Sequence, residues 1–128
     1  SSSSTNNVSN NTVVTLNSDG RGIFVYSSTT NDILNNTVTT YGSTGYNIML
    51  QLSSTNNVLS NNITTSNSTG HGIFIYSSSN SNNFSNNNIT TSGTSGYGVY
   101  LYSSSLNNIS NINITTLGPD SEKDLFRG

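Results

Sequence analysis

A repeat of about 25 residues runs through the whole chain of 128 residues. Each copy reads approximately Asn-Asn-Val-x-x-Asn-x-Ile-Thr-Thr, followed by a loop and then by Gly-x-Gly-Ile-x-Ile-Tyr-Ser-Ser. The first apolar column of the repeat advances in steps of 25, 25, 26 and 25 residues, and its members are Val8, Ile33, Val58, Phe84 and Ile109. A constant period of this length is typical of solenoids, in which each copy packs only on its neighbours. The sequence therefore predicts about five stacked coils.

Each copy contains three short stretches in which apolar and polar residues alternate, as in a strand with one buried face. In the third coil these stretches centre on Val58, on Ile63, and on Ile73 with Ile75. β-Branched residues, Asn, Ser and Gly dominate, which disfavours helix. The sequence predicts an all-β fold, a single-stranded parallel β-helix with three short strands per coil, each stacked on its own copies.

Asparagine recurs at the corner between the first and second strands, as Asn11, Asn36, Asn61 and Asn87. Asn tolerates the left-handed backbone region, so we expect these residues to make the bend. Stacked amides can also pass hydrogen bonds from coil to coil as a ladder. The alternative is that Asn only marks the turn. The last coil carries Ile112 at this position, so a ladder would end one coil early.

The repeat resembles the right-handed parallel β-helix repeats of NosD-like proteins and of the carbohydrate-binding and sugar-hydrolase β-helix superfamily. The likeness rests on Asn57-Val58-Leu59-Ser60-Asn61-Asn62-Ile63 and on Gly72-Ile73-Phe74-Ile75-Tyr76-Ser77-Ser78, with equivalents in every coil, and it covers residues 3 to about 117. The resemblance implies a right-handed coil. It says little about function, because enzymes, surface proteins and scaffolds share this architecture.

Charge and composition argue against several classes of function. The net charge is −2 with three Lys or Arg, so we expect no nucleic-acid partner. No apolar run approaches the length of a membrane span, so we expect no membrane insertion. Asp19 and Asp32 are isolated in their columns, and His71 has no carboxylate partner. We therefore predict no catalytic residues, no metal site, no cofactor and no enzymatic activity.

Aromatic residues recur at outward positions of the third strand. We single them out as candidate contacts for a sugar, for a second copy of the chain, or for another part of the parent protein: Phe24, Tyr26, Phe74, Tyr76, Tyr100 and Tyr102. The alternative is that aromatic residues simply favour strands and pair along the sheet.

The second strand presents Asn and Thr outward. Thr-x-Thr ladders on a β-solenoid resemble those of ice-binding proteins, although Asn interrupts the ladder here. The repeat also creates Asn-x-Ser/Thr sequons, and the candidate glycosylation sites are Asn67, Asn62, Asn88 and Asn113.

The organisation of the chain indicates a structural role. Residues 3–28 and 53–78 are identical at 17 of 26 positions, which indicates that a two-coil unit was copied, as in long extracellular stalks. We place the solenoid at residues 1–117 and a charged tail, a cap or a linker, at residues 118–128. The predicted function is a non-catalytic segment of an extracellular or cell-surface protein that associates with copies of itself. A carbohydrate-binding module is the main alternative, ahead of an ice-binding protein or a fragment of a polysaccharide-degrading enzyme.

Overall fold

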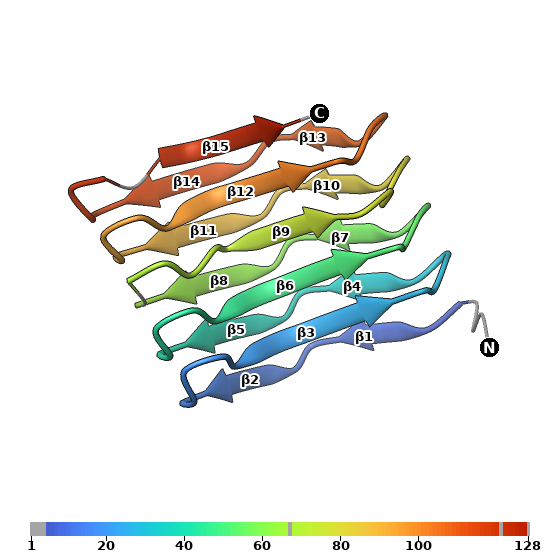
Figure 1. Ribbon diagram of the computed structural model, residues 1–128. Coiled ribbons are helices and arrows are strands. Elements are labelled where there is room, and N and C mark those ends of the chain that lie inside the picture. Colours follow the sequence, from blue (N-terminus) through green and yellow to red (C-terminus); the bar gives the residue numbers. More distant parts are fainter. Residues whose placement is uncertain (1–4, 67, 121, 128) are drawn as a thin grey trace.

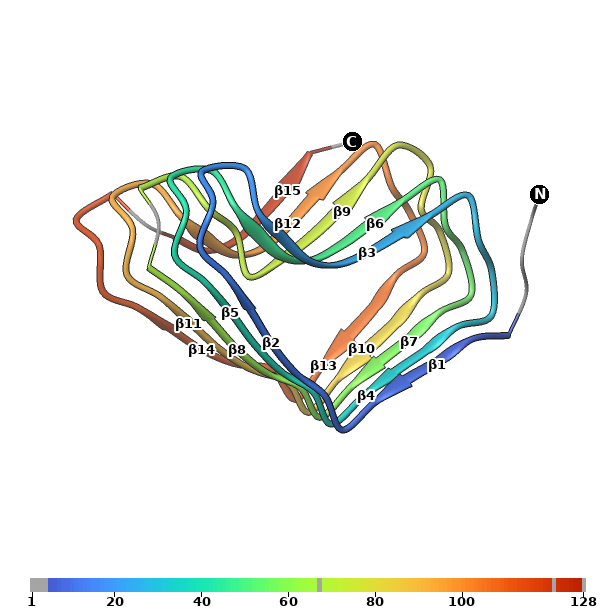
Figure 2. The same ribbon diagram turned by 90° about the horizontal axis from the view of Figure 1, so that it is seen from below.

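The chain climbs as a right-handed coil in which each turn lays down three strands (Figure 1). This computed structural model describes residues 5–66, 68–120 and 122–127, and in these ranges it contains strands but no helix. The strands form three parallel five-stranded sheets, each built from every third strand along the chain. Figure 2, a view along the coil, shows the sheets of the first and second strands of each coil meeting at one corner, while the sheet of the third strands lies across their open side. The predicted β-helix is confirmed.

The first strands of the coils make sheet 1, which contains β1 (Asn7–Ser9), β4 (Asp32–Leu34), β7 (Asn57–Leu59), β10 (Asn83–Ser85) and β13 (Asn108–Ser110). The second strands make sheet 2, which contains β2 (Thr12–Thr15), β5 (Thr37–Thr40), β8 (Asn62–Thr65), β11 (Asn88–Thr91) and β14 (Asn113–Thr116). The third strands make sheet 3, which contains β3 (Arg21–Tyr26), β6 (Tyr46–Gln51), β9 (Ile73–Tyr76), β12 (Tyr97–Tyr102) and β15 (Glu122–Arg127).

The core consists of apolar columns that run through the coils. Each inward residue pairs with its own equivalent one coil away, as Val58 does with Ile33 and with Phe84. Inward residues of the middle coils, such as Ile63 and Ile73, are fully buried, whereas Val8 and Ile109 in the outer coils are only partly buried. With so few apolar residues, this stacking is what supplies a continuous core.

The left-handed residue at the first corner is not the one expected. The positive φ angles belong to the residues just before the Asn column, such as Asn35 (φ 55°) and Ser60 (φ 56°), rather than to Asn36 and Asn61. The prediction that the column itself adopts the left-handed conformation was wrong. A left-handed residue turns the chain, and the asparagine that follows is free to point its amide along the stack.

The step of 26 residues reflects one extra residue, which lies in the corner between β9 and β10. Ser77, Ser78 and Ser81 have positive φ there, 52°, 59° and 56°, whereas the corresponding corners of other coils have two such residues, such as Ser27 and Thr30. The following strand, β10, pairs with β7 in the same column register as its neighbours. The corner therefore absorbs the extra residue without disturbing the sheets.

The second residue of β3 and of β12, with its equivalents in the other coils, faces inward and is glycine in most coils. A Cβ added at Gly72 would lie 2.4 Å from Cγ2 of Ile89 and 2.7 Å from the backbone oxygen of Gly98, closer than any real Cβ contact. The second coil carries Asn47 at this position, fully buried, and neither amide atom has a hydrogen-bond partner among the described residues. An unpaired buried amide opposes folding by about 1–3 kcal/mol.

Part of the segment set apart as a charged tail is a strand of the solenoid. β15 pairs in parallel with β12, with Tyr97 opposite Glu122 and Val99 opposite Asp124. Sheet 3 therefore extends beyond residue 117, the expected end of the solenoid. The sequence did not indicate this strand because Asp124 stands where other coils carry an apolar residue.

Candidate functional site on the outer face of sheet 3

Three outward columns cross sheet 3 and carry nearly all its large surface side chains. The first contains Arg21, Tyr46, His71, Tyr97 and Glu122. The second contains Phe24, Met49, Phe74 and Tyr100, and the third contains Tyr26, Gln51, Tyr76 and Tyr102. The structure thus brings the six predicted aromatic contacts onto one face and adds Tyr46, His71 and Tyr97, which the sequence analysis did not single out.

The rings of this face stack along the coil axis. Phe74 and Tyr100 stack with centroids 5.1 Å apart and planes 20° apart, and Tyr76 and Tyr102 stack at 5.6 Å and 24°. Tyr46, in the first column of the second coil, extends these contacts by one coil, with its ring centroid 4.9 Å from that of Phe74. Pairs of this geometry stabilise a sheet by about 0.5–1.5 kcal/mol each beyond the area they bury. The faces of these rings are therefore used within the molecule.

His71 lies at the centre of this aromatic cluster. Its ring is 5.0 Å from Tyr100, edge to face at 90°, and 5.1 and 5.3 Å from Tyr97 and Tyr46. The side chain is only 8% exposed, and burial lowers the pKa of the imidazole to about 4. Its Nδ1 accepts a hydrogen bond from the backbone N–H of Tyr97 at 3.2 Å, which places the proton of the neutral ring on Nε2. His71 is therefore a neutral packing residue at pH 7.

The ends of the aromatic face are more open than its centre. Phe24 and Tyr26 are 40% and 56% exposed, and Tyr102 is 40% exposed. The Arg21 guanidinium lies over the Phe24 ring, 4.6 Å from its centroid. Met49 lies in the same outward column as Phe24 and Phe74 but is buried between them. This face is thus an apolar layer with a cation at one end.

The two aspartates of the coil body make structural contacts. The Asp19 carboxylate accepts a hydrogen bond from the hydroxyl of Thr44 in the next coil. Asp32 accepts one from the amide of Asn57, at 2.8 Å, also one coil away. Each carboxylate therefore ties one coil to the next.

The predicted Asn column forms a ladder of hydrogen bonds. Both the backbone N–H and the side-chain amide of Asn36 donate to Oδ1 of Asn61, at 2.9 and 3.0 Å, and Asn61 donates to Asn87 in the same way. Asn11 donates to Asn36 at the first coil. The Asn61 amide also donates to the backbone oxygen of Ile33 at 2.9 Å, so the ladder satisfies buried backbone groups as well.

A second Asn ladder, not predicted from the sequence, lies at the corner before sheet 1. Its members are Asn6, Asn31, Asn56, Asn82 and Asn107, and each donates twice to the next. The same corner also carries a serine ladder, which joins Ser28, Ser53, Ser79 and Ser104. The signal was present, because these columns advance in the same steps as the apolar ones.

The candidate glycosylation sites form a surface ladder on sheet 2. Asn62, Asn88 and Asn113 are exposed, and the amides of Asn88 and Asn113 donate to the preceding member at 3.0 and 2.8 Å. Asn67 lies outside the described residues. Glycosylation of these three exposed residues stays a prediction.

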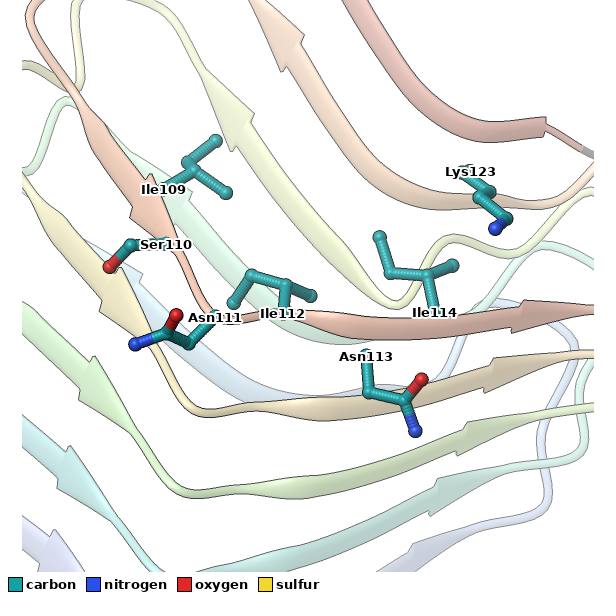
Figure 3. Close-up of a pocket in the computed structure, with 7 residues that line it drawn as sticks. All are labelled: Ile109, Ser110, Asn111, Ile112, Asn113, Ile114 and Lys123. Carbon is teal, nitrogen blue, oxygen red and sulfur yellow. The ribbon is translucent and has the colours of Figure 1, made fainter.

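The two ends of the coil stack expose its interior. At the last coil a hollow of about 320 Å³ is lined by Ile109, Ile112 and Ile114 with Lys123 at its rim (Figure 3). At the first coil a hollow of about 290 Å³ is lined by Val8, Ile23 and Val25 among others. Both are the cross-section of the apolar columns, where a further coil would pack.

Comparison with known families identifies the repeat. The profile of NosD, described as periplasmic copper-binding protein, matches residues 1–114. The chain belongs to the NosD family. The resemblance read from the repeat is confirmed, and the family description is consistent with a place outside the cytoplasm. No curated protein and no solved structure matches the chain significantly.

The copper named in the NosD description finds no fitting ligand set among the described residues. The chain has one His, one Met and no Cys. No group of three His, Cys, Asp or Glu side chains occurs in the part that the structure describes. Copper favours clustered imidazole, thiolate and thioether ligands, whereas His71 packs among aromatic rings and its Nδ1 accepts a backbone hydrogen bond.

Within the described residues no helix is long and apolar enough to cross a membrane.

Proposed function

We propose that this chain is a non-catalytic, structural β-solenoid segment of a periplasmic or cell-surface protein. The observation that carries the proposal is the use of its repeated polar residues. The recurring asparagine and serine side chains form hydrogen bonds between coils, as those of Asn36, Asn61, Ser53 and their equivalents do. Asp19 and Asp32 do the same. A chain whose recurring polar groups hold coils together is suited to extend and to present its faces.

Assembly with further coils is part of this proposal. Both ends present strand edges, ladder groups and a hollow, of which Figure 3 shows the one at the last coil. Such edges pair readily with another strand of matching register. The ladders run in one direction, with Asn11 donating to Asn36 and onward, so a coil added at either end must keep that polarity. We expect such coils to come from other parts of the parent protein.

A screen for polysaccharide cleavage tests the non-catalytic role. We expect no cleavage of neutral or acidic polysaccharides by the purified chain. Cleavage that disappears in an Asp19→Asn or Asp32→Asn variant would overturn the proposal. The Asn113→Ala variant, changed on the exposed face of sheet 2, is the matched control.

The proposed location outside the cytoplasm is tested by cell fractionation of the native host. The family description supports a periplasmic or surface fraction. Recovery of the protein only with cytoplasmic markers would contradict this part of the proposal.

Carbohydrate binding at the aromatic face is the second candidate, and the exposure of Phe24 and Tyr26 favours it at one end of that face. Sugars stack on ring faces, and the faces of Phe74 and Tyr100 are already turned to each other. Binding on a glycan array should therefore be lost in a Phe24→Ala, Tyr26→Ala double variant and kept when Thr12 and Thr37 on sheet 2 are changed to Ala. The absence of any array signal from the unchanged chain would reject this candidate.

A further inference from the structure

We propose that two copies of the chain pair through the outer faces of sheet 3 in opposite axial directions, with Arg21 of each copy against Glu122 of the other. This inference rests on the proposed structural function and names the partner and the surface. The pairing has a two-fold axis that lies between the two faces and runs parallel to the strands.

Charge placement on sheet 3 is the first argument. Arg21 and Glu122 are exposed side chains of the same outward column, at its first and last coils. They lie four coils apart, about 19 Å at the usual strand spacing, so they cannot pair within one copy. A two-fold axis parallel to the strands keeps each column facing itself and reverses the order of the coils. The first coil then meets the fifth, and both charges find a partner of opposite sign.

The side chains between the two charges are the second argument. Between Arg21 and Glu122 the column holds Tyr46, His71 and Tyr97, and His71 is neutral at pH 7. In the proposed pairing Tyr46 faces the partner's Tyr97, and His71 lies near its own equivalent at the axis. The charged groups would flank an aromatic centre, the usual arrangement of a protein interface.

The size of the face sets the strength of the pairing. Strands of about six residues span about 20 Å, and five strands span about 24 Å, so each copy contributes about 480 Å². The pair then buries about 1,000 Å², at the lower limit for a specific interface. The dimer is therefore weak, and the two ion pairs select the arrangement more than they strengthen it.

Sedimentation equilibrium on the full chain, from micromolar to millimolar concentration and at low salt, is the first experiment. We expect a monomer–dimer equilibrium that stops at the dimer and weakens with added salt. Arg21→Glu alone, or Glu122→Arg alone, should weaken dimerisation at least tenfold, because each places like charges in contact. The double variant Arg21→Glu, Glu122→Arg should restore it. Asp32→Arg on sheet 1, with the same charge change as Glu122→Arg, should leave it unchanged.

A cysteine cross-link tests the direction of pairing. The chain has no cysteine, so an Arg21→Cys, Glu122→Cys double variant can form disulfides only at these two positions. We expect oxidation to yield a covalent dimer that joins position 21 of one copy to position 122 of the other. An Arg21→Cys, Asn113→Cys variant, with its second cysteine on sheet 2, should stay monomeric.

Several results would overturn the pairing. These are a monomer at every concentration, a dimer indifferent to the charge reversals, or assemblies that grow without limit through the coil ends. None of them touches the non-catalytic role, which fails only if polysaccharide cleavage is found. The two proposals are therefore judged separately.

Discussion

Single residues at the corners carry a conformational cost that the chain meets unevenly. Leu106 has φ of 58° and is 84% exposed, at a position where other coils carry Thr or Ser with similar φ. The left-handed conformation costs an ordinary residue about 1–2 kcal/mol, and Asn pays less because its short polar side chain hydrogen-bonds locally. Leu106→Asn should therefore raise the free energy of unfolding by about 1 kcal/mol, measured by urea denaturation. Leu117→Asn, also exposed but with φ outside this region, is the control and should give no gain.

Asn47 is a second residue whose replacement should stabilise the fold. Its side chain is fully buried, and neither amide atom has a partner among the described residues. Leu has the same branched side-chain skeleton and removes the unpaired groups, each of which costs about 1–3 kcal/mol when buried. We expect Asn47→Leu to raise the thermal midpoint. The matched change at Asn56, whose amide donates to Asn82 at 2.9 Å, should lower it. A lower midpoint for Asn47→Leu would show that its amide has a partner.

His71 makes stability depend on pH over a defined range. Burial lowers the pKa of His71 in the folded state from 6.5 to about 4. Between pH 6.5 and about pH 4, His71 is therefore protonated in the unfolded chain but neutral in the folded chain. The stabilisation is fully present above pH 6.5 and is lost as the pH falls to about 4, with a total of about 3 kcal/mol. His71→Tyr, which matches Tyr46 and Tyr97 in its column, should abolish this loss. Urea unfolding at pH 7.5, 5.5 and 4 measures it, and an equal loss in the variant would contradict the assignment.

At the scale of strands and corners, the sequence predicts the sheets well and the polar corners less well. Strands such as Thr37–Thr40 could be recognised because alternation and repetition agree on the same residues. The left-handed residues could not, because Thr, Ser, Asn and Leu all occupy those positions. At such corners the stack imposes the backbone conformation, whatever the residue. β15 was missed because Asp124 stands opposite Val99, at a register position where other coils carry an apolar residue.

The aromatic face shows the same division. Alternation predicted that Phe74 and Tyr76 point outward, and they do. It could not predict that His71 would be buried, because burial comes from rings of neighbouring coils, Tyr46 and Tyr100 among them. A lone histidine in a sequence does not show what stacks above and below it.

Among these elements, the Asn ladder that contains Asn61 should contribute most to the free energy of unfolding. Asn61→Ala removes the acceptor of both Asn36 donors and the donor to Ile33, and these groups are buried. Each buried group left unpaired costs about 1–3 kcal/mol, so we expect a loss of about 3 kcal/mol or more in urea unfolding. Asn113→Ala, on the exposed sheet 2 ladder, is the matched control and should cost less than about 0.5 kcal/mol. Equal losses in the two variants would mean that the buried ladder adds no more to stability than the exposed one.

At the scale of the whole molecule, every coil is held by the same columns and ladders, so the number of coils should be adjustable. A second copy of residues 12–61 inserted after Asn61 keeps the register, because Thr12, Thr37 and Asn62 begin equivalent strands. The insert adds two coils and lengthens the stack by about 10 Å. In a solenoid, stability grows with each interface between neighbouring repeats. The lengthened chain should therefore unfold in one transition, at higher urea and with a larger dependence on denaturant than the original.

Small-angle X-ray scattering measures the added length, and urea denaturation followed by circular dichroism measures the stability. A scrambled insert of the same composition is the control, and it should add a disordered loop without raising the stability. Two separate unfolding transitions, or an unchanged transition with the correctly repeated insert, would contradict the nearest-neighbour account. Residues 3–28 and 53–78 are similar and lie two coils apart, so the sequence already repeats with a two-coil period, and the insert adds one more such period.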